Sequence, residues 1–172
     1  TVTGVQTCAL PIWKGIAGDV VRRRFAAQET GSGTFRMNVA LSELADFLCR
    51  PGREQQPHHG SGIVIGPSLN YLDRAYMDAR RDGWSAEPIV EMLIPSTLDP
   101  SLALPGRHVA SLFVQHVAPH LPTPRSWSDP REKERFADIV IATVNRHAPN
   151  FAASVLGRQV LSPLDLEQRF GL

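Results

Sequence analysis

The feature that most constrains the fold is a strict alternation of apolar and polar side chains over residues 34–41. Phe35, Met37, Val39 and Leu41 occupy every second position of this segment. The positions between them hold Thr34, Arg36, Asn38 and Ala40. A period of two places the first set on one side of a strand and the second set on the other. We therefore expect a half-buried strand in an antiparallel sheet.

Further segments predict about five strands and three or four helices. Strands are expected at 63–65, 88–96, 107–118 and 154–161, and helices at 16–28, 68–83, 130–147 and from 163 onward. Residues 50–62 are expected to form a loop. The strands cluster along the chain instead of alternating regularly with helices, so the fold class is α+β. We expect a mostly antiparallel or mixed sheet of about five strands covered by helices.

Two helices show clear signals for their ends and faces. Asp129, Pro130 at the next position and Glu132 at the third predict the start of the longest helix through a capping box. In the helix over 68–83, Leu69, Leu72, Tyr76 and Ala79 are expected on the buried face.

The composition excludes several classes of function. The 172 residues contain 18 basic and 17 acidic side chains, so a nucleic-acid partner is not expected. No apolar run approaches the roughly 20 residues of a membrane-spanning helix, so no transmembrane segment is expected. Cys8 and Cys49 have no metal-binding or disulfide-scaffold spacing. The length suits one domain.

Motifs for nucleotide phosphates and metals are missing from the sequence. The pairs Gly31/Gly33 and Gly60/Gly62 precede expected strands rather than helices, so they indicate turns and not a dinucleotide-binding loop. Of the six histidines, His116 and His120 are four apart, but Pro119 between them disfavours a shared helical face. We therefore expect no metal site, and a histidine-metal hydrolase is the weakest hypothesis.

Polar residues inside the expected strands have two interpretations. The candidates for lining a substrate site are Arg36, Asn38, Glu91, Gln115 and Arg158. They could mark the hydrated face of a one-sided sheet, with Arg36 and Glu91 forming a cross-strand pair. The functional alternative is that they orient a ligand on a mainly apolar surface. The sequence pattern leaves both interpretations open.

The amino-acid sequences of five long segments resemble those of the phytoene desaturase-like FAD-dependent oxidoreductases, an amine oxidase-like family. The matching segments are 32–44, 58–80, 88–99, 108–119 and 150–172. The resemblance implies that residues 13–172 are a fragment of the substrate domain, without the Rossmann half that binds FAD. It implies an intact enzyme in which FAD accepts a hydride equivalent from an apolar small-molecule substrate. The fragment alone is expected to be inactive, and its oligomeric state remains unknown.

The ends of the chain carry separate expectations. Residues 1–12 resemble translated sequencing-adapter read-through, so we expect them to be unstructured. The family has a Ser/Thr-Pro-x-Asp element that leads back toward the flavin, and it matches Ser162, Pro163 and Asp165. The resemblance places these residues near the cofactor, although Ser162 and Asp165 also fit a simple helix cap. It identifies no catalytic residue, and it implies a cytoplasmic location in bacteria and a mitochondrial one for eukaryotic relatives.

A second hypothesis comes from a different class of function. The balanced charge, the missing catalytic motifs and a plausible single core are also typical of a self-contained α+β ligand-binding or dimerisation module without catalytic activity.

Overall fold

The computed structural model describes residues 18–27, 33–52 and 54–170. Within these ranges the strands are β1 (Phe35–Leu41), β2 (Ile63–Ile65), β3 (Trp84–Leu93), β4 (His108–Val117) and β5 (Val155–Leu161). The helices are α2 (Asp19–Ala26), α3 (Leu69–Asp82), α4 (Pro130–His147), α5 (Phe151–Ser154) and α6 (Pro163–Phe170). Short 3-10 turns form η1 (Pro57–Gly60), η2 (Pro95–Thr97) and η3 (Pro100–Leu102). Residues 1–12 and parts of the expected first helix, over 16–28, lie outside the described residues.

The strands form one open sheet in the order β2-β3-β4-β1-β5, and every neighbouring pair is antiparallel. The predicted α+β class is therefore confirmed. Strand β3 begins four residues earlier than the expected 88–96. Its register against β4 shifts between Trp84, which pairs with Val117, and Ile89, which pairs with Gln115. Pro88 lies within this irregular stretch, where the sequence shows no clean alternation.

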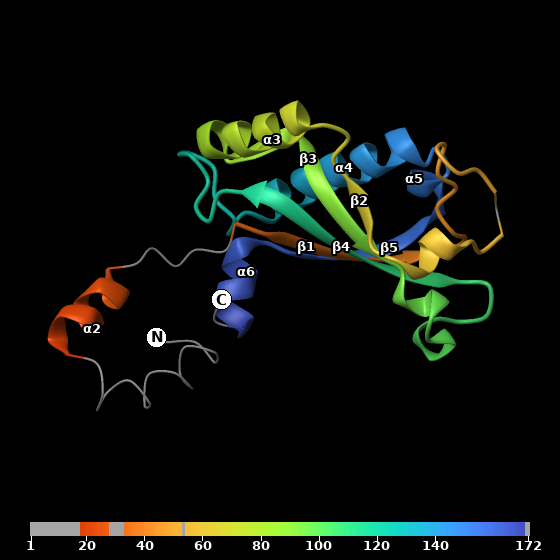
Figure 1. Cartoon of the computed structure of the whole chain (residues 1–172), viewed down its shortest axis with the longest axis horizontal. Helices are drawn as coiled ribbons and strands as arrows, with labels where there is room; N and C mark the ends of the chain where they lie inside the picture. The colour runs from red at the N-terminus through yellow and green to blue at the C-terminus, as the bar shows by residue number, and fades with distance from the viewer. Residues whose placement is uncertain (1–17, 28–32, 53, 171–172) are drawn as a thin grey trace.

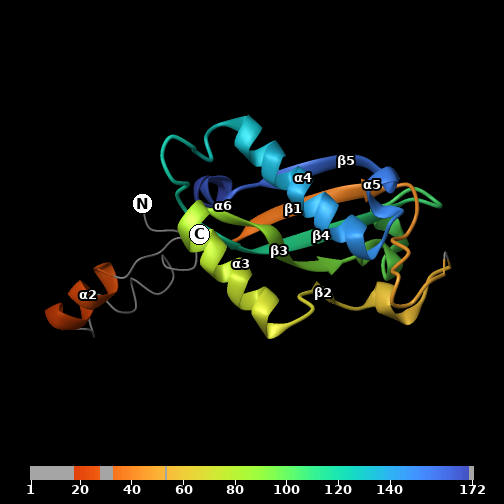
Figure 2. The ribbon, with the colours of Figure 1, turned by 90° about the horizontal axis from the view of Figure 1, so that it is seen from above.

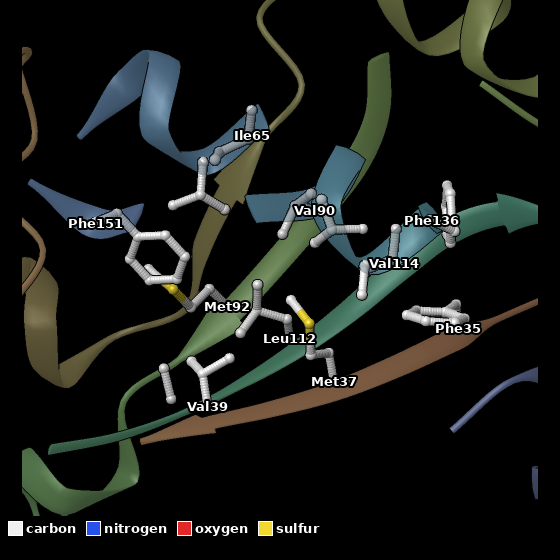
Figure 3. Packing of buried hydrophobic residues seen from close by; sticks show 14 of the residues in the cluster. Phe35, Met37, Val39, Ile65, Val90, Met92, Leu112, Val114, Phe136 and Phe151 are labelled. Carbon is white, nitrogen blue, oxygen red and sulfur yellow. The ribbon is translucent and has the colours of Figure 1, made fainter. Parts of the chain in front are cut away.

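Helices α3 and α4 lie on the same side of the sheet (Figures 1 and 2). The predicted apolar set of β1 faces them: Phe35, Met37, Val39 and Leu41 are all buried, at 1% exposure or less. Figure 3 shows Phe35, Met37 and Val39 of β1 together with side chains of β3 and β4, opposite Phe136 of α4. The rings of Phe35 and Phe136 meet edge to face at 4.9 Å, a favourable aromatic geometry.

Three helix ends follow local capping chemistry. Ser68 caps α3 by accepting a hydrogen bond from the Tyr71 N–H, and Gly83 ends it at a positive φ of 91°. Asp129 caps α4 as predicted, accepting from the Arg131 N–H. The expected capping box is absent from the described contacts of α4, because the Glu132 carboxylate faces Arg125 at 3.9 Å instead.

The buried face of α3 agrees with the expected one at Ala79 but differs from it at Leu69 and Tyr76. Tyr71, Ala75 and Ala79 are buried, whereas Leu69 is 83% exposed and Tyr76 is 41% exposed. The two alanines lack bulk, so the helix packs with this side against the sheet. The Tyr71 hydroxyl then donates a hydrogen bond to the Pro88 carbonyl at 2.8 Å. The prediction of the buried face relied too much on large apolar residues and too little on small ones.

Candidate functional site

The sheet has a second face, opposite α3 and α4, which we call the open face. Its polar members come from four strands: Arg36, Asn38, Glu91, Ser111, Gln115 and Gln159. They are exposed or partly buried, in contrast to the neighbouring residues of each central strand. Four of the five predicted substrate-lining residues therefore share this face: Arg36, Asn38, Glu91 and Gln115. Their role in substrate binding stays a prediction.

Arg36 is the second residue of β1, and its side chain contacts two neutral neighbours. Its Nη2 donates a hydrogen bond to the Ser111 hydroxyl at 3.1 Å. The guanidinium carbon also lies 5.3 Å from the centre of the Phe113 ring, within the range of a cation–π contact. Phe113 is the direct cross-strand partner of Arg36 on β4.

The expected cross-strand pair of Arg36 with Glu91 is wrong. Strand β4 separates β1 from β3, so Phe113 stands between the two charged residues in the same register row. The Glu91 carboxylate instead accepts a hydrogen bond from the Gln115 amide at 3.0 Å. Asn38 donates a longer bond of 3.4 Å to Gln159. Glu91 thus bonds a side-chain amide, whereas Arg36 contacts a hydroxyl and an aromatic ring.

Arg158 lies on the opposite side of the sheet from the other candidates. Its strand partner is the buried Val39, and its guanidinium binds Glu134 at 2.9 Å and Asp138 at 2.6 Å, both on α4. Burial lowers the pKa of Arg158, but the hydrogen bonds to Asp138 and Glu134 outweigh it and raise the pKa overall. Gln159, its neighbour, occupies the open face instead, because successive strand residues point to opposite faces.

Ser162, Pro163 and Asp165 form the start of α6. The Ser162 N–H and hydroxyl both donate to the Asp165 carboxylate, at 2.8 and 2.6 Å, and the Asp165 N–H donates back to the hydroxyl. Lys133 of α4 donates to both carboxylate oxygens at 2.7 and 2.8 Å. These contacts make a reciprocal helix cap anchored to α4. A position near a flavin stays a prediction for these residues.

Three histidines gather where η1 meets the strand ends, a feature that the sequence did not reveal. His59 is buried, with Nδ1 accepting from the Gln56 N–H at 3.0 Å and Nε2 lying 2.9 Å from the Ala45 carbonyl. Both ring nitrogens of His58 and Nδ1 of His108 are buried and have no hydrogen-bond partner among the residues that the structure describes. Burial is the largest cause that lowers the pKa of His58 and of His108. Burial therefore disfavours the charged form of His58 and of His108.

Two other kinds of site are absent from the part of the chain that the structure describes. No group of three or more His, Cys, Asp or Glu side chains there has a geometry that could hold a metal ion. Within the same ranges, no helix has the length and apolar character needed to cross a membrane.

Comparison with known proteins finds similar chains in mammals. The chain is 38% identical over 154 residues to pyridine nucleotide-disulfide oxidoreductase domain-containing protein 2 of Rattus norvegicus, and equally to that of Mus musculus. The match covers 87% of this chain but 26% of each relative. The chain thus spans about a quarter of the length of these curated relatives. No family model matches.

Proposed function

We propose that this chain is the substrate domain of an FAD-dependent oxidoreductase of the phytoene desaturase-like, amine oxidase-like type. In the intact protein, the open face would form one wall of the site for an apolar substrate. The similarity to proteins named as oxidoreductase domain-containing supports an oxidoreductase. Because the chain spans a quarter of their length, the remaining parts of the intact protein would bind the cofactor.

The observation that carries this proposal is the character of the open face. Helices cover the inner face of the sheet and complete a core there (Figure 1), so the open face is not needed to bury that core. It combines apolar side chains with a few polar groups, and Val64 and Leu93 are 64% and 56% exposed. Ligand sites have this composition: an apolar surface with a few placed polar groups.

The chain's own residues would orient the substrate and exclude water. When bound, FAD would supply the chemistry by accepting the hydride equivalent. Arg36, Asn38 and Gln115 could hold the polar end of a substrate on the open face. Glu91 is the one carboxylate of the open-face set, and it already accepts a hydrogen bond from Gln115. No general base is assigned.

The residues present do not form a direct FAD site. The backbone N–H and the hydroxyl of Ser162, and the carboxylate of Asp165, are all bonded to one another or to Lys133. The Ser162 residue is also completely buried. Binding a flavin through these atoms would break the cap of α6. We propose that this element positions α6 and leaves contact with the cofactor to other parts of the intact protein.

The test compares two purified proteins: the 172-residue chain and the product of the complete reading frame that contains it. We expect the longer product to absorb between about 350 and about 500 nm, as flavoproteins do, and the chain alone to be colourless. A longer product that takes up no flavin after incubation with excess FAD would refute the proposal. Stoichiometric flavin on the 172-residue chain alone would refute it as well.

A second candidate function is a self-contained ligand-binding or dimerisation module. It is favoured by the continuous core on one side of the sheet, which includes residues of β1, β3, β4 and α4. This hypothesis predicts a monodisperse chain that unfolds in one cooperative transition. A reading frame with no cofactor-binding region on either side would favour it over the proposal above.

A further inference from the structure

We infer that Arg36 on the open face binds the carboxylate of an apolar organic acid. This inference rests on the proposed function, because it names the class of substrate that the open face would accept. Arg36 would hold the acidic end of the ligand, while the hydrocarbon part lies over neighbouring apolar side chains.

The first argument is the missing counter-ion of Arg36. Four basic residues are partly buried in the described ranges: Arg36, Arg125, Lys133 and Arg158. Three of them lie within 4.0 Å of a carboxylate: Arg125 of Glu132 at 3.9 Å, Lys133 of Asp165 at 2.7 Å, and Arg158 of Asp138 at 2.6 Å. Arg36 forms no such pair with any described carboxylate. A partly buried charge is normally paired because desolvation is costly, so its anion is expected from outside.

The second argument is the way the guanidinium is held. The guanidinium carbon lies 5.3 Å from the centre of the Phe113 ring, and the Ser111 hydroxyl accepts a hydrogen bond from one N–H group. Its other N–H groups meet no acceptor among the side chains that the structure describes. A guanidinium carries five N–H donors in a planar fork that fits a carboxylate with two parallel bonds. Arg36 is thus oriented, and most of its donors are unused.

The third argument concerns the surroundings that a ligand would meet. In the register row of Arg36, the neighbours on β4 and β5 are Phe113 and Leu161, both apolar. In the adjacent row, Asn38 lies opposite Ser111, and both are neutral. Glu91 is two strands away from Arg36, and Gln115 already donates to it. An anion at Arg36 therefore has apolar and neutral neighbours, which is the pattern expected for an acid with a hydrocarbon body.

The test uses the 172-residue chain and two small probes, hexanoate and 1-hexanol, which differ in charge at one end. Binding is followed by the amide resonances of β1 and β4 in ¹H–¹⁵N spectra. We expect hexanoate to bind at millimolar concentration and to bind Arg36→Met about tenfold more weakly, the loss expected for one charge-assisted interaction. Binding of hexanol should not change with this substitution. Arg107→Met is the matched control, since Arg107 is exposed and immediately precedes β4.

Two outcomes would overturn the inference in different ways. If hexanol and hexanoate bind equally, and Arg36→Met changes neither, then the open face is apolar but does not select acids. The proposed function would survive that result. If neither probe binds, the counter-ion of Arg36 belongs to another part of the intact protein. Should Arg36→Met fail to fold, Arg36→Lys keeps the charge but removes the fork, and hexanoate should then bind more weakly than to the unchanged chain.

Discussion

The contact of α6 with the rest of the fold gives the sharpest prediction about stability. Asp165→Ala removes the acceptor of four hydrogen bonds, two from Ser162 and two from Lys133. The side chains of Lys133 and Asp165 are only 20% and 18% exposed, so solvent screens the pair little. The substitution would leave the ammonium group partly buried without its partner.

The expected loss follows from two contributions. Loss of the helix cap costs about 1 kcal/mol. Loss of a hydrogen-bonded ion pair in a partly buried position costs about 1.5–3 kcal/mol. We therefore expect Asp165→Ala to reduce the free energy of unfolding by about 2–4 kcal/mol. Lys133→Met keeps the cap and loses only the pair, so its effect should be smaller.

Urea unfolding at pH 7, followed by circular dichroism, measures these differences as shifts of the midpoint at constant slope. Asp99→Ala is the control, because Asp99 caps the exposed turn η3 and its carboxylate bonds only Ser101. That variant should lose less than about 1 kcal/mol. An Asp165→Ala midpoint equal to that of Asp99→Ala would refute the reasoning.

The pKa of Asp165 adds a dependence on pH to the same prediction. Burial raises this pKa, but the hydrogen bonds from Lys133 and Ser162 outweigh burial and lower it overall. A carboxyl with a lowered folded pKa stabilises the fold above its unfolded pKa of about 3.9. That stability is lost as the pH falls through the lower folded pKa. The difference between the unchanged chain and Asp165→Ala should therefore shrink when the pH is lowered from 5 toward 3.

Three further perturbations test other parts of the fold. Burial lowers the pKa of His58 in the folded chain, so the unfolded chain binds a proton at this residue more readily. The free energy of unfolding should therefore fall as the pH drops below the unfolded pKa of about 6.5. Between pH 7.5 and pH 5, the urea midpoint of His58→Phe should change less than that of the unchanged chain. Gly83→Ala should destabilise more than Gly106→Ala in thermal unfolding, since both have positive φ but only Gly83 has atoms within 3 Å of an added Cβ; equal effects would contradict the steric argument. Phe136→Ala should cost about 3–5 kcal/mol in urea unfolding, whereas Phe170→Ala, at 57% exposure, should cost far less, and similar losses would show that Phe136 is not central to the core.

Local patterns in the sequence predicted most of the individual elements. The alternation over 34–41 gave β1, because its apolar side faces the core and its polar side faces outward. The residues Asp129 and Pro130 gave the start of α4, since capping depends on neighbours within one turn. Strand β4 is shorter than the expected range by one residue at each end, and β5 by one residue at its start. These features need no knowledge of how distant segments meet.

The errors arose where distant segments determine the outcome. The expected pair of Arg36 with Glu91 required β1 and β3 to be neighbours, but the sheet order places β4 between them. The face of Arg158 was equally hidden, because β5 has no clean alternation and its partner β1 decides which residues turn inward. The histidine cluster joins His108 to the adjacent residues His58 and His59, which lie 49 or more positions earlier in the chain.

The inner face of the sheet contributes to the stability of the fold, whereas the open face is proposed to bind the substrate. Substitutions on the two faces should therefore differ in their effect on the free energy of unfolding. The inner-face side chains of β1 are buried in the core, so substitutions there act on folding. Arg36 lies on the same strand, but its side chain contacts a single hydroxyl and one ring among the described residues. Replacing it should therefore change the free energy of unfolding by about 1 kcal/mol or less. A larger loss in Arg36→Met would mean that the guanidinium serves the fold, and the argument for an external anion would lose its basis.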